Sequence, residues 1–208
     1  MKKTIVAAAL LLASVSAFAQ SQGDFFVEGT FGLSAGSVKT TTKSGDNSNT
    51  NKSSLATDFN IYAGAGYFVM DNLKVGADLG YVLSKDGDTK TPVFAIAPNV
   101  AYYVELANNF YYVPEFNVNV LFGSQNYSTS VLGTTVSKSY SYTGFGAALT
   151  FLGFEYRFNK SIALGVDIAN LYYNSVKLKD KDDKKQSTTT GIFGVDFGSA
   201  TVALRFYF

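Results

Sequence analysis

LKVGADLGYVLS, at residues 73–84, alternates apolar side chains with small or polar ones. Every second residue from Leu73 to Leu83 is apolar, and the residues between them are small or polar, with Val82 as the exception. A period of two is that of a β-strand, because successive side chains of a strand point to opposite sides. The stretch therefore predicts a strand with one apolar face and one small or polar face.

The same alternation recurs along most of the chain. We expect strands at residues 25–33, 59–69, 73–83, 94–106, 110–122, 140–158, 162–168 and 193–208. These make eight strands, and a barrel whose two chain ends lie on one side requires an even number. The predicted fold class is therefore all-β, an eight-stranded antiparallel up-and-down barrel.

Two of the predicted strands change phase part-way. The apolar residues of 145–151 fall on odd positions and those of 154–158 on even ones, and the last strand changes in the same way after residue 197. A β-bulge near Gly153 and another near Gly198 would restore a single apolar face in each strand, and glycine is common at bulges. The alternative is that the odd stretches lie above the membrane.

The connectors between the strands fall into two classes. Three are tight, at residues 70–72, 107–109 and 159–161, and four are longer and polar, at residues 39–54, 85–92, 124–138 and 174–190. Eleven of the 15 lysines lie in the longer connectors. Short turns at one end and long loops at the other are typical of an outer membrane barrel with periplasmic turns and extracellular loops.

The two faces of the strands differ in bulk. The side chains at the apolar positions are bulky and form a continuous face. The opposite face holds Gly, Ala, Ser, Asn and charged residues, which supply too little apolar volume for a conventional core. A membrane barrel turns its apolar face to lipid, whereas a soluble barrel hides that face inside. We therefore expect a transmembrane β-barrel, with a soluble β-barrel or sandwich as the alternative.

The N-terminus has the features of an export signal. Lys2 and Lys3 precede an apolar stretch at residues 4–13, and Ala17 and Ala19 are the small residues that a signal peptidase reads. We expect residues 1–19 to be a cleaved signal peptide and residues 20–208 to form the outer membrane domain. Cleavage would change the net charge from +1 to −1, since two lysines are lost.

Composition excludes several classes of site. The chain has no Cys, no His and no Trp, so disulfides, thiolate or imidazole metal ligands, and catalysis by Cys or His are excluded. The near-zero net charge gives no footprint for nucleic acid. No run of 18 apolar residues could form a transmembrane helix. We assign no catalytic, cofactor-binding or metal-binding residue.

Charged side chains gather on the face predicted to point inward. They are Glu28, Lys74, Asp78, Glu105, Glu115, Glu155, Arg157, Asp167 and Arg205. An eight-stranded barrel has room inside for side chains only, so these residues predict a charged network that fills the lumen. Because the first and last strands pair to close the barrel, we expect Glu28 and Arg205 to approach at the seam, in a network that also reaches Glu155 and Arg157.

The whole predicted pattern resembles the small outer membrane barrels of the OmpA/OmpX type, known as the outer membrane protein beta-barrel domain or porin family. The export signal, eight alternating strands, tight turns and a terminal phenylalanine carry this resemblance. It implies that the C-terminal residues Val202, Leu204, Phe206 and Phe208 form the signal read by the barrel-assembly machinery. It also implies that tyrosines take the place of the usual mixed aromatic girdle, namely Tyr67, Tyr81, Tyr112, Tyr140, Tyr142, Tyr156 and Tyr172.

The resemblance implies contact with outer membrane lipid and lipopolysaccharide, and a possible extracellular ligand at the long loops. Related barrels that modify lipids use a histidine, which this chain lacks, so we expect no enzymatic activity. The sequence thus predicts a structural or surface-interaction role with a side-chain-filled lumen, and a narrow channel for small solutes or ions is the alternative. Bulky inward residues favour a filled lumen: Tyr62, Tyr103, Tyr111, Leu121 and Tyr207.

Overall fold

The computed structural model describes residues 21–36, 39–44, 47–52, 56–131, 134–181, 187–197 and 200–208. The predicted signal peptide, residues 1–19, lies outside this range. All regular secondary structure in the described residues is β-strand. No helix among them is long and apolar enough to cross a membrane.

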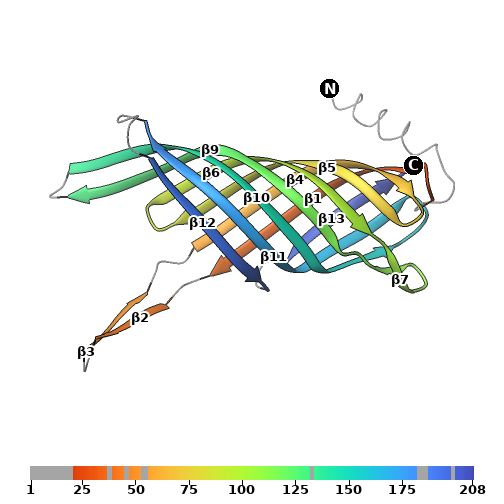
Figure 1. Ribbon diagram of the computed structural model, residues 1–208, viewed down its shortest axis with the longest axis horizontal. Coiled ribbons are helices and arrows are strands. Elements are labelled where there is room, and N and C mark those ends of the chain that lie inside the picture. Colours follow the sequence, from red (N-terminus) through yellow and green to blue (C-terminus); the bar gives the residue numbers. More distant parts are fainter. Residues whose placement is uncertain are drawn as a thin grey trace.

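The strands close into a ring of antiparallel neighbours (Figure 1). In ring order they are β1 (Phe25–Gly36), β4 (Ala56–Met70), β5 (Leu73–Asp86), β6 (Thr89–Tyr102) with β7 (Val104–Ala107), β8 (Phe110–Tyr112) with β9 (Glu115–Val131), β10 (Thr134–Arg157), β11 (Ile162–Asp180), and β12 (Ser187–Asp196) with β13 (Thr201–Tyr207). Three walls of the ring are each built from two strands separated by a short break. In the described residues the ring therefore has eight walls, which confirms the predicted eight-stranded barrel.

The ring closes between the first and last strands. Phe26 to Gly32 of β1 pair with Tyr207 to Thr201 of β13 in an unbroken antiparallel register. A separate hairpin, β2 (Lys39–Ser44) with β3 (Asn47–Lys52), follows β1 in the sequence. The start of β1 and the C-terminal residue Phe208 lie at the end of the barrel that carries the tight turns (Figure 1).

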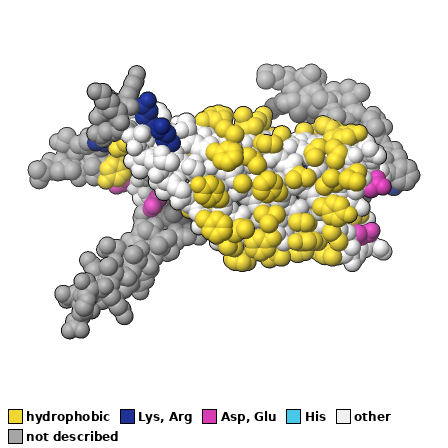
Figure 2. Space-filling model, viewed as in Figure 1, with side chains coloured by type: hydrophobic (Ala, Val, Ile, Leu, Met, Phe, Trp, Pro, Cys, Tyr) yellow, Lys and Arg dark blue, Asp and Glu magenta, His cyan; other side chains and the backbone are white. Residues whose placement is uncertain are grey.

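The outer face of the barrel is apolar and the inner face is mixed. Figure 2 shows a broad hydrophobic band across the face of the barrel in view, with charged side chains beyond its ends. Outward residues such as Leu79 and Phe94 are 64% and 54% exposed, whereas inward Phe26 and Phe68 are fully buried. An apolar exterior of this extent is the arrangement of a barrel that faces lipid.

The phase change in β10 has the predicted cause. The pairing of β10 with β11 shifts register between Thr150 and Gly153, so that residues 151 and 152 interrupt the alternation. This confirms the bulge predicted near Gly153. The second predicted bulge, near Gly198, lies outside the described residues, and the last wall is interrupted there between Asp196 and Thr201.

The phase of β11 changes beside the β10 bulge, which the sequence did not predict. Tyr172 consequently lines the interior, as do Tyr142 and Tyr140 on the upper part of β10. Their expected place in an outer aromatic girdle is therefore wrong. Ring contacts agree with the outward prediction for Tyr81 and Tyr112, which pack against outward Phe94 and Phe154, respectively.

The predicted long loops are mostly strand. Between β5 and β6 only residues 87 and 88 are unpaired, and β9 and β10 pair as far as Val131 and Thr134. These segments are rich in Thr, Ser and Tyr, whose polar side chains can bond across strands, as Ser128 and Ser137 do at 3.2 Å. The tight turns are as predicted, with Asn72 and Asn109 in the left-handed conformation at φ 64°.

Candidate functional site

The lumen holds all but one of the charged residues that the sequence predicted to point inward. Glu28, Gly64 and Asp78 lie side by side on β1, β4 and β5, since Glu28 pairs with Gly64 and Gly64 with Asp78. A Cβ atom on Gly64 would collide with both carboxylate side chains. The absence of a side chain at Gly64 therefore makes the space in which two acids from neighbouring strands lie across the inner wall.

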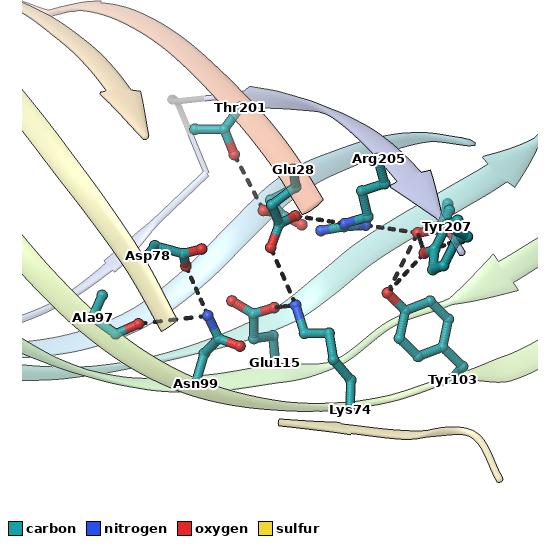
Figure 3. A network of polar contacts seen from close by, with 12 residues as sticks. Glu28, Lys74, Asp78, Ala97, Asn99, Tyr103, Glu115, Thr201, Arg205 and Tyr207 are labelled. Atoms are coloured by element: carbon teal, nitrogen blue, oxygen red, sulfur yellow. Dashed lines mark hydrogen bonds and ion pairs between the residues drawn. The ribbon is translucent and has the colours of Figure 1, made fainter. Parts of the chain in front are cut away.

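Arg205 contacts two carboxylates of the lumen, and Figure 3 shows its contact with Glu28. Its Nε donates to Glu28 Oε2 at 2.6 Å and its Nη1 to Glu155 Oε2 at 2.8 Å. Glu28 stands directly opposite Arg205 in the β1–β13 pairing, whereas Glu155 comes from β10. The structure thus brings Glu28 and Arg205 together at the seam and links the seam to another wall.

Lys74 is fully buried and contacts two carboxylates. Its Nζ donates to Glu115 Oε2 at 2.7 Å and lies 3.5 Å from Glu28 Oε1, as Figure 3 shows. It also lies 5.0 Å from the centre of the Phe26 ring. Removing a charge from water costs several kcal/mol, and opposite charges with good hydrogen bonds must offset that cost. Lys74 can therefore be buried only because Glu28 and Glu115 accompany it.

Arg157 and Tyr207 complete the cluster around Glu155. The Nε of Arg157 donates to Glu155 Oε1 at 3.0 Å, and its guanidinium lies 4.1 Å from the centre of the Tyr207 ring. The Tyr207 hydroxyl donates to the same carboxylate, 2.7 Å from Oε2, and Tyr103 lies within 3.4 Å of it. Glu155, itself fully buried, is thus surrounded by two arginines and two hydroxyls.

The remaining predicted residues lie at the edges of the network. Asp78 accepts a hydrogen bond from Asn99 Nδ2 at 2.7 Å, and Asp167 accepts one from Thr201 at 3.2 Å. Glu105, in contrast, is exposed on β7, and the described residues give it no ion pair. The expectation that Glu105 joins the lumen network is wrong because β7 lies at the turn end of the barrel, where the inner face meets solvent.

An aromatic layer lies beside the charged network at the turn end of the barrel. Phe26, Phe68, Tyr103 and Tyr207 are each at most 2% exposed, and Phe68 packs 5.4 Å from Tyr103 and 6.2 Å from Tyr207, ring centre to ring centre. The sequence predicted the two tyrosines as bulky inward residues and missed the two phenylalanines. Gly66 was a usable signal that Phe26 points inward, because Gly66 pairs directly opposite Phe26 and the Phe26 ring occupies the space over this glycine.

The lumen contains cavities on the hairpin side of the charged network. A polar cavity of about 270 Å³ is lined by Asp78, Asp167 and Asn60 among others, and a second of about 250 Å³ is lined by Tyr62, Leu121 and Tyr142. A third, of about 410 Å³, lies among the ends of the long hairpins. The lumen is therefore packed at the turn end and contains space toward the hairpin end.

The predicted assembly residues lie on the last strand. Val202, Leu204 and Phe206 face outward on β13, between 39% and 42% exposed. The terminal Phe208 exchanges two backbone hydrogen bonds with Phe25, at 2.8 and 3.2 Å. The final residue thus takes part in closing the ring.

Comparison with known proteins assigns this barrel to a protein family. The model of the outer membrane protein beta-barrel domain matches residues 5–200. The chain belongs to this family. A protein of the outer membrane protein beta-barrel family crosses the outer membrane with its strands, so the apolar exterior faces lipid. No curated protein matches the chain in sequence.

Solved structures similar to this family member are outer membrane barrels of low sequence identity. Neisserial surface protein A matches with 16% identity and a TM-score of 0.45, over 89% of this chain and 99% of the other. Ail, the attachment invasion locus protein of Yersinia pestis, matches with 12% identity and a TM-score of 0.44, over 90% and 99%. The outer membrane protease OmpT of Escherichia coli matches with 10% identity and a TM-score of 0.37, over 94% and 99%.

Proposed function

We propose that this protein is a structural or surface-interaction barrel of the outer membrane whose lumen is filled by side chains at the turn end. One observation carries the proposal: Lys74, Arg157 and Arg205 interlock with Glu28 and Glu155 next to a closed aromatic layer. A solute crossing this region would have to separate buried ion pairs. Breaking such a pair by removing one partner costs about 3–5 kcal/mol, so the packed arrangement opposes passage.

The hairpins at the other end supply the surface for such a role. The β9–β10 and β11–β12 hairpins are much longer than the tight turns of the opposite end. They carry the exposed residues Lys177 and Lys179. Contact with lipopolysaccharide or with an extracellular ligand through these hairpins belongs to the proposal. The proposal also includes export directed by a cleaved signal peptide at residues 1–19, insertion by the barrel-assembly machinery, and the lack of enzymatic activity.

The test is planar-bilayer conductance of the refolded chain 20–208. We expect a flat current with no discrete steps, with the folded state checked by its heat-dependent gel mobility. A second sample carrying Phe68→Ala and Tyr103→Ala removes two rings of the aromatic layer and leaves every charged partner of the network in place. Stable steps from the unaltered chain would overturn the proposal.

A narrow channel is the second candidate, and the three cavities favour it. The central cavity is lined by five acidic residues and by Arg205 as its one basic residue. An acidic lining attracts cations, because like charges are repelled and opposite charges are concentrated in a low-dielectric passage. If the unaltered chain conducts, this candidate predicts steps that select cations over anions.

A further inference from the structure

The outer surface carries an apolar groove of about 740 Å³ across β1, β4, β5, β6 and β9. Its floor is made of small residues, with Gly29 directly opposite Ala63. Phe31, Ile61, Leu79 and Phe94 stand around the floor, each at least half exposed. A Cβ atom added to Gly29 would meet no protein atom within 4 Å, so the groove is open there.

Aromatic rings form the wall of the groove nearest the hairpins. Tyr81 and Phe94 face each other on β5 and β6 with ring centres 5.2 Å apart, and Phe94 stacks on Phe122 of β9 at 6.2 Å. Ile61 and Phe31 continue this row across β4 and β1. The groove thus lies in the lipid-facing band, where the molecules available to fill it are membrane lipids.

Two lysines lie above the aromatic row on the same two strands. Lys85 is four residues beyond Tyr81 on β5, Lys90 is four residues before Phe94 on β6, and the two are paired directly opposite each other. Both are exposed, and by the alternation of their strands both point outward like Tyr81 and Phe94. Four residues of strand correspond to roughly 13 Å, so the lysines lie near the hairpin-side edge of the apolar band.

The lysine pair is unfavourable without an anion. Like charges directly opposite on neighbouring strands are destabilising. Their outward neighbours are Thr57 on β4 and Asn126 on β9, so no carboxylate flanks them in this row. Neither lysine forms an ion pair with the described residues. Lys85 and Lys90 with their neighbours Thr57 and Asn126 therefore form a line of cations and polar side chains at the level of the lipid headgroups.

We infer that the groove and the lysine pair bind one anionic phosphorylated lipid of the leaflet on the hairpin side. The headgroup phosphate lies between Lys85 and Lys90, and an acyl chain lies in the groove over Gly29 and Ala63. This inference rests on the placement of the barrel in the membrane, which family membership gives, and it is independent of whether the lumen conducts. A conducting barrel would leave it unchanged.

The absence of tryptophan allows a direct test. Phe94→Trp places one fluorescent side chain in the groove wall, the groove reporter. Phe145→Trp on β10 places a matched outward side chain on another part of the barrel, the control reporter. Each variant is refolded in phosphatidylcholine vesicles that contain a minor fraction of phosphatidylglycerol. Acyl chains brominated on one lipid or the other quench a reporter only when that lipid is in contact.

We expect phosphatidylglycerol to be preferred at the groove reporter and not at the control reporter. Since a lysine near an anionic surface is worth about 1 kcal/mol, or roughly a fivefold change in affinity, Lys85→Ser with Lys90→Ser should abolish the preference. Lys160→Ser, at an exposed lysine of the tight turn on the opposite end of the barrel, is the control and should leave it intact. Gly29→Leu fills the floor and should lower quenching of the groove reporter by both lipids.

Three results would overturn the inference. The first is equal quenching of the groove reporter by both lipids. The second is a preference that survives loss of Lys85 and Lys90, which would mean that these lysines do not bind the headgroup. The third is the same preference at the control reporter, which would mean general attraction to the whole rim. Heat-dependent gel mobility of every variant shows that the barrel has folded.

Discussion

At the scale of single residues, the lumen charges depend on one another. Arg205 lies between Glu28 and Glu155, so its removal leaves two buried carboxylates with fewer partners. We expect Arg205→Met to lower the free energy of unfolding by about 3–5 kcal/mol, since the cost comes mainly from the charge left behind. Arg205→Met combined with Glu28→Gln should lose less, because position 28 then holds no charge that has lost its nearest partner, while Lys74 keeps Glu115. Urea titration of barrels refolded in vesicles measures each free energy.

A double-mutant cycle separates coupling from general damage. Lys138→Met, at an exposed lysine of the β9–β10 hairpin, is the control that should add independently to Arg205→Met. Strictly additive losses for Arg205→Met and Glu28→Gln would show that the two residues do not couple, despite the 2.6 Å contact between them.

The partners of these charges could be predicted only in part. Strand parity and closure of the ring were enough to bring Glu28 to Arg205. They could not show that Gly165 lies beneath the Arg205 guanidinium, where a Cβ atom would approach Nη1 to 2.6 Å. From the sequence alone, Gly165 is an inward glycine at which a small substitution such as Gly165→Ser would be expected to do little harm. In the structure this substitution displaces the buried guanidinium of Arg205.

At the scale of strands, alternation predicts well where the strands lie. It predicts poorly which side chains face inward in the parts of the strands nearest the long hairpins. β5 keeps one phase throughout, and its outer and inner faces follow from the sequence alone. Between Ile168 and Asn174 the polar residues Asn170 and Asn174 occupy even positions, which face the interior, and Tyr172 between them obscured this change of phase in β11. It follows from the bulge in the neighbouring β10, a property of the pair rather than of either strand.

The depth of each outward residue can be tested on β11. Leu164 lies two residues after the start of the strand and Ile168 lies six residues after it. Since arginine on the lipid face costs about 2–4 kcal/mol at the midplane and about 0–1 near the interface, Ile168→Arg should destabilise more than Leu164→Arg. Ala148→Ser, which faces the central cavity, is the inward control and should change the free energy of unfolding little. Equal losses at Leu164 and Ile168 would contradict the depth assigned to this strand.

At the scale of the whole molecule, the barrel is divided along its axis. Aromatic packing and ion pairs fill the turn end, and cavities and polar hairpins occupy the other end. The first and last strands of the barrel meet at the packed end, where Phe208 pairs with Phe25. The buried packing is therefore concentrated at one end of the barrel, and the polar hairpins lie at the other.

The terminal residue separates stability from assembly. Phe208→Ala keeps both backbone hydrogen bonds to Phe25 and loses only a ring contact 6.4 Å from Phe25, so the refolded barrel should lose less than about 1 kcal/mol. Deleting Phe208 removes both bonds as well and should cost roughly 1–3 kcal/mol. If the residue is also read during insertion, Phe208→Ala should sharply reduce the folded barrel recovered from outer membranes, although the refolded protein is nearly unchanged. Phe158→Ala, an outward ring at the same end, is the matched control; an equal yield from both alanine variants would remove the assembly role of Phe208.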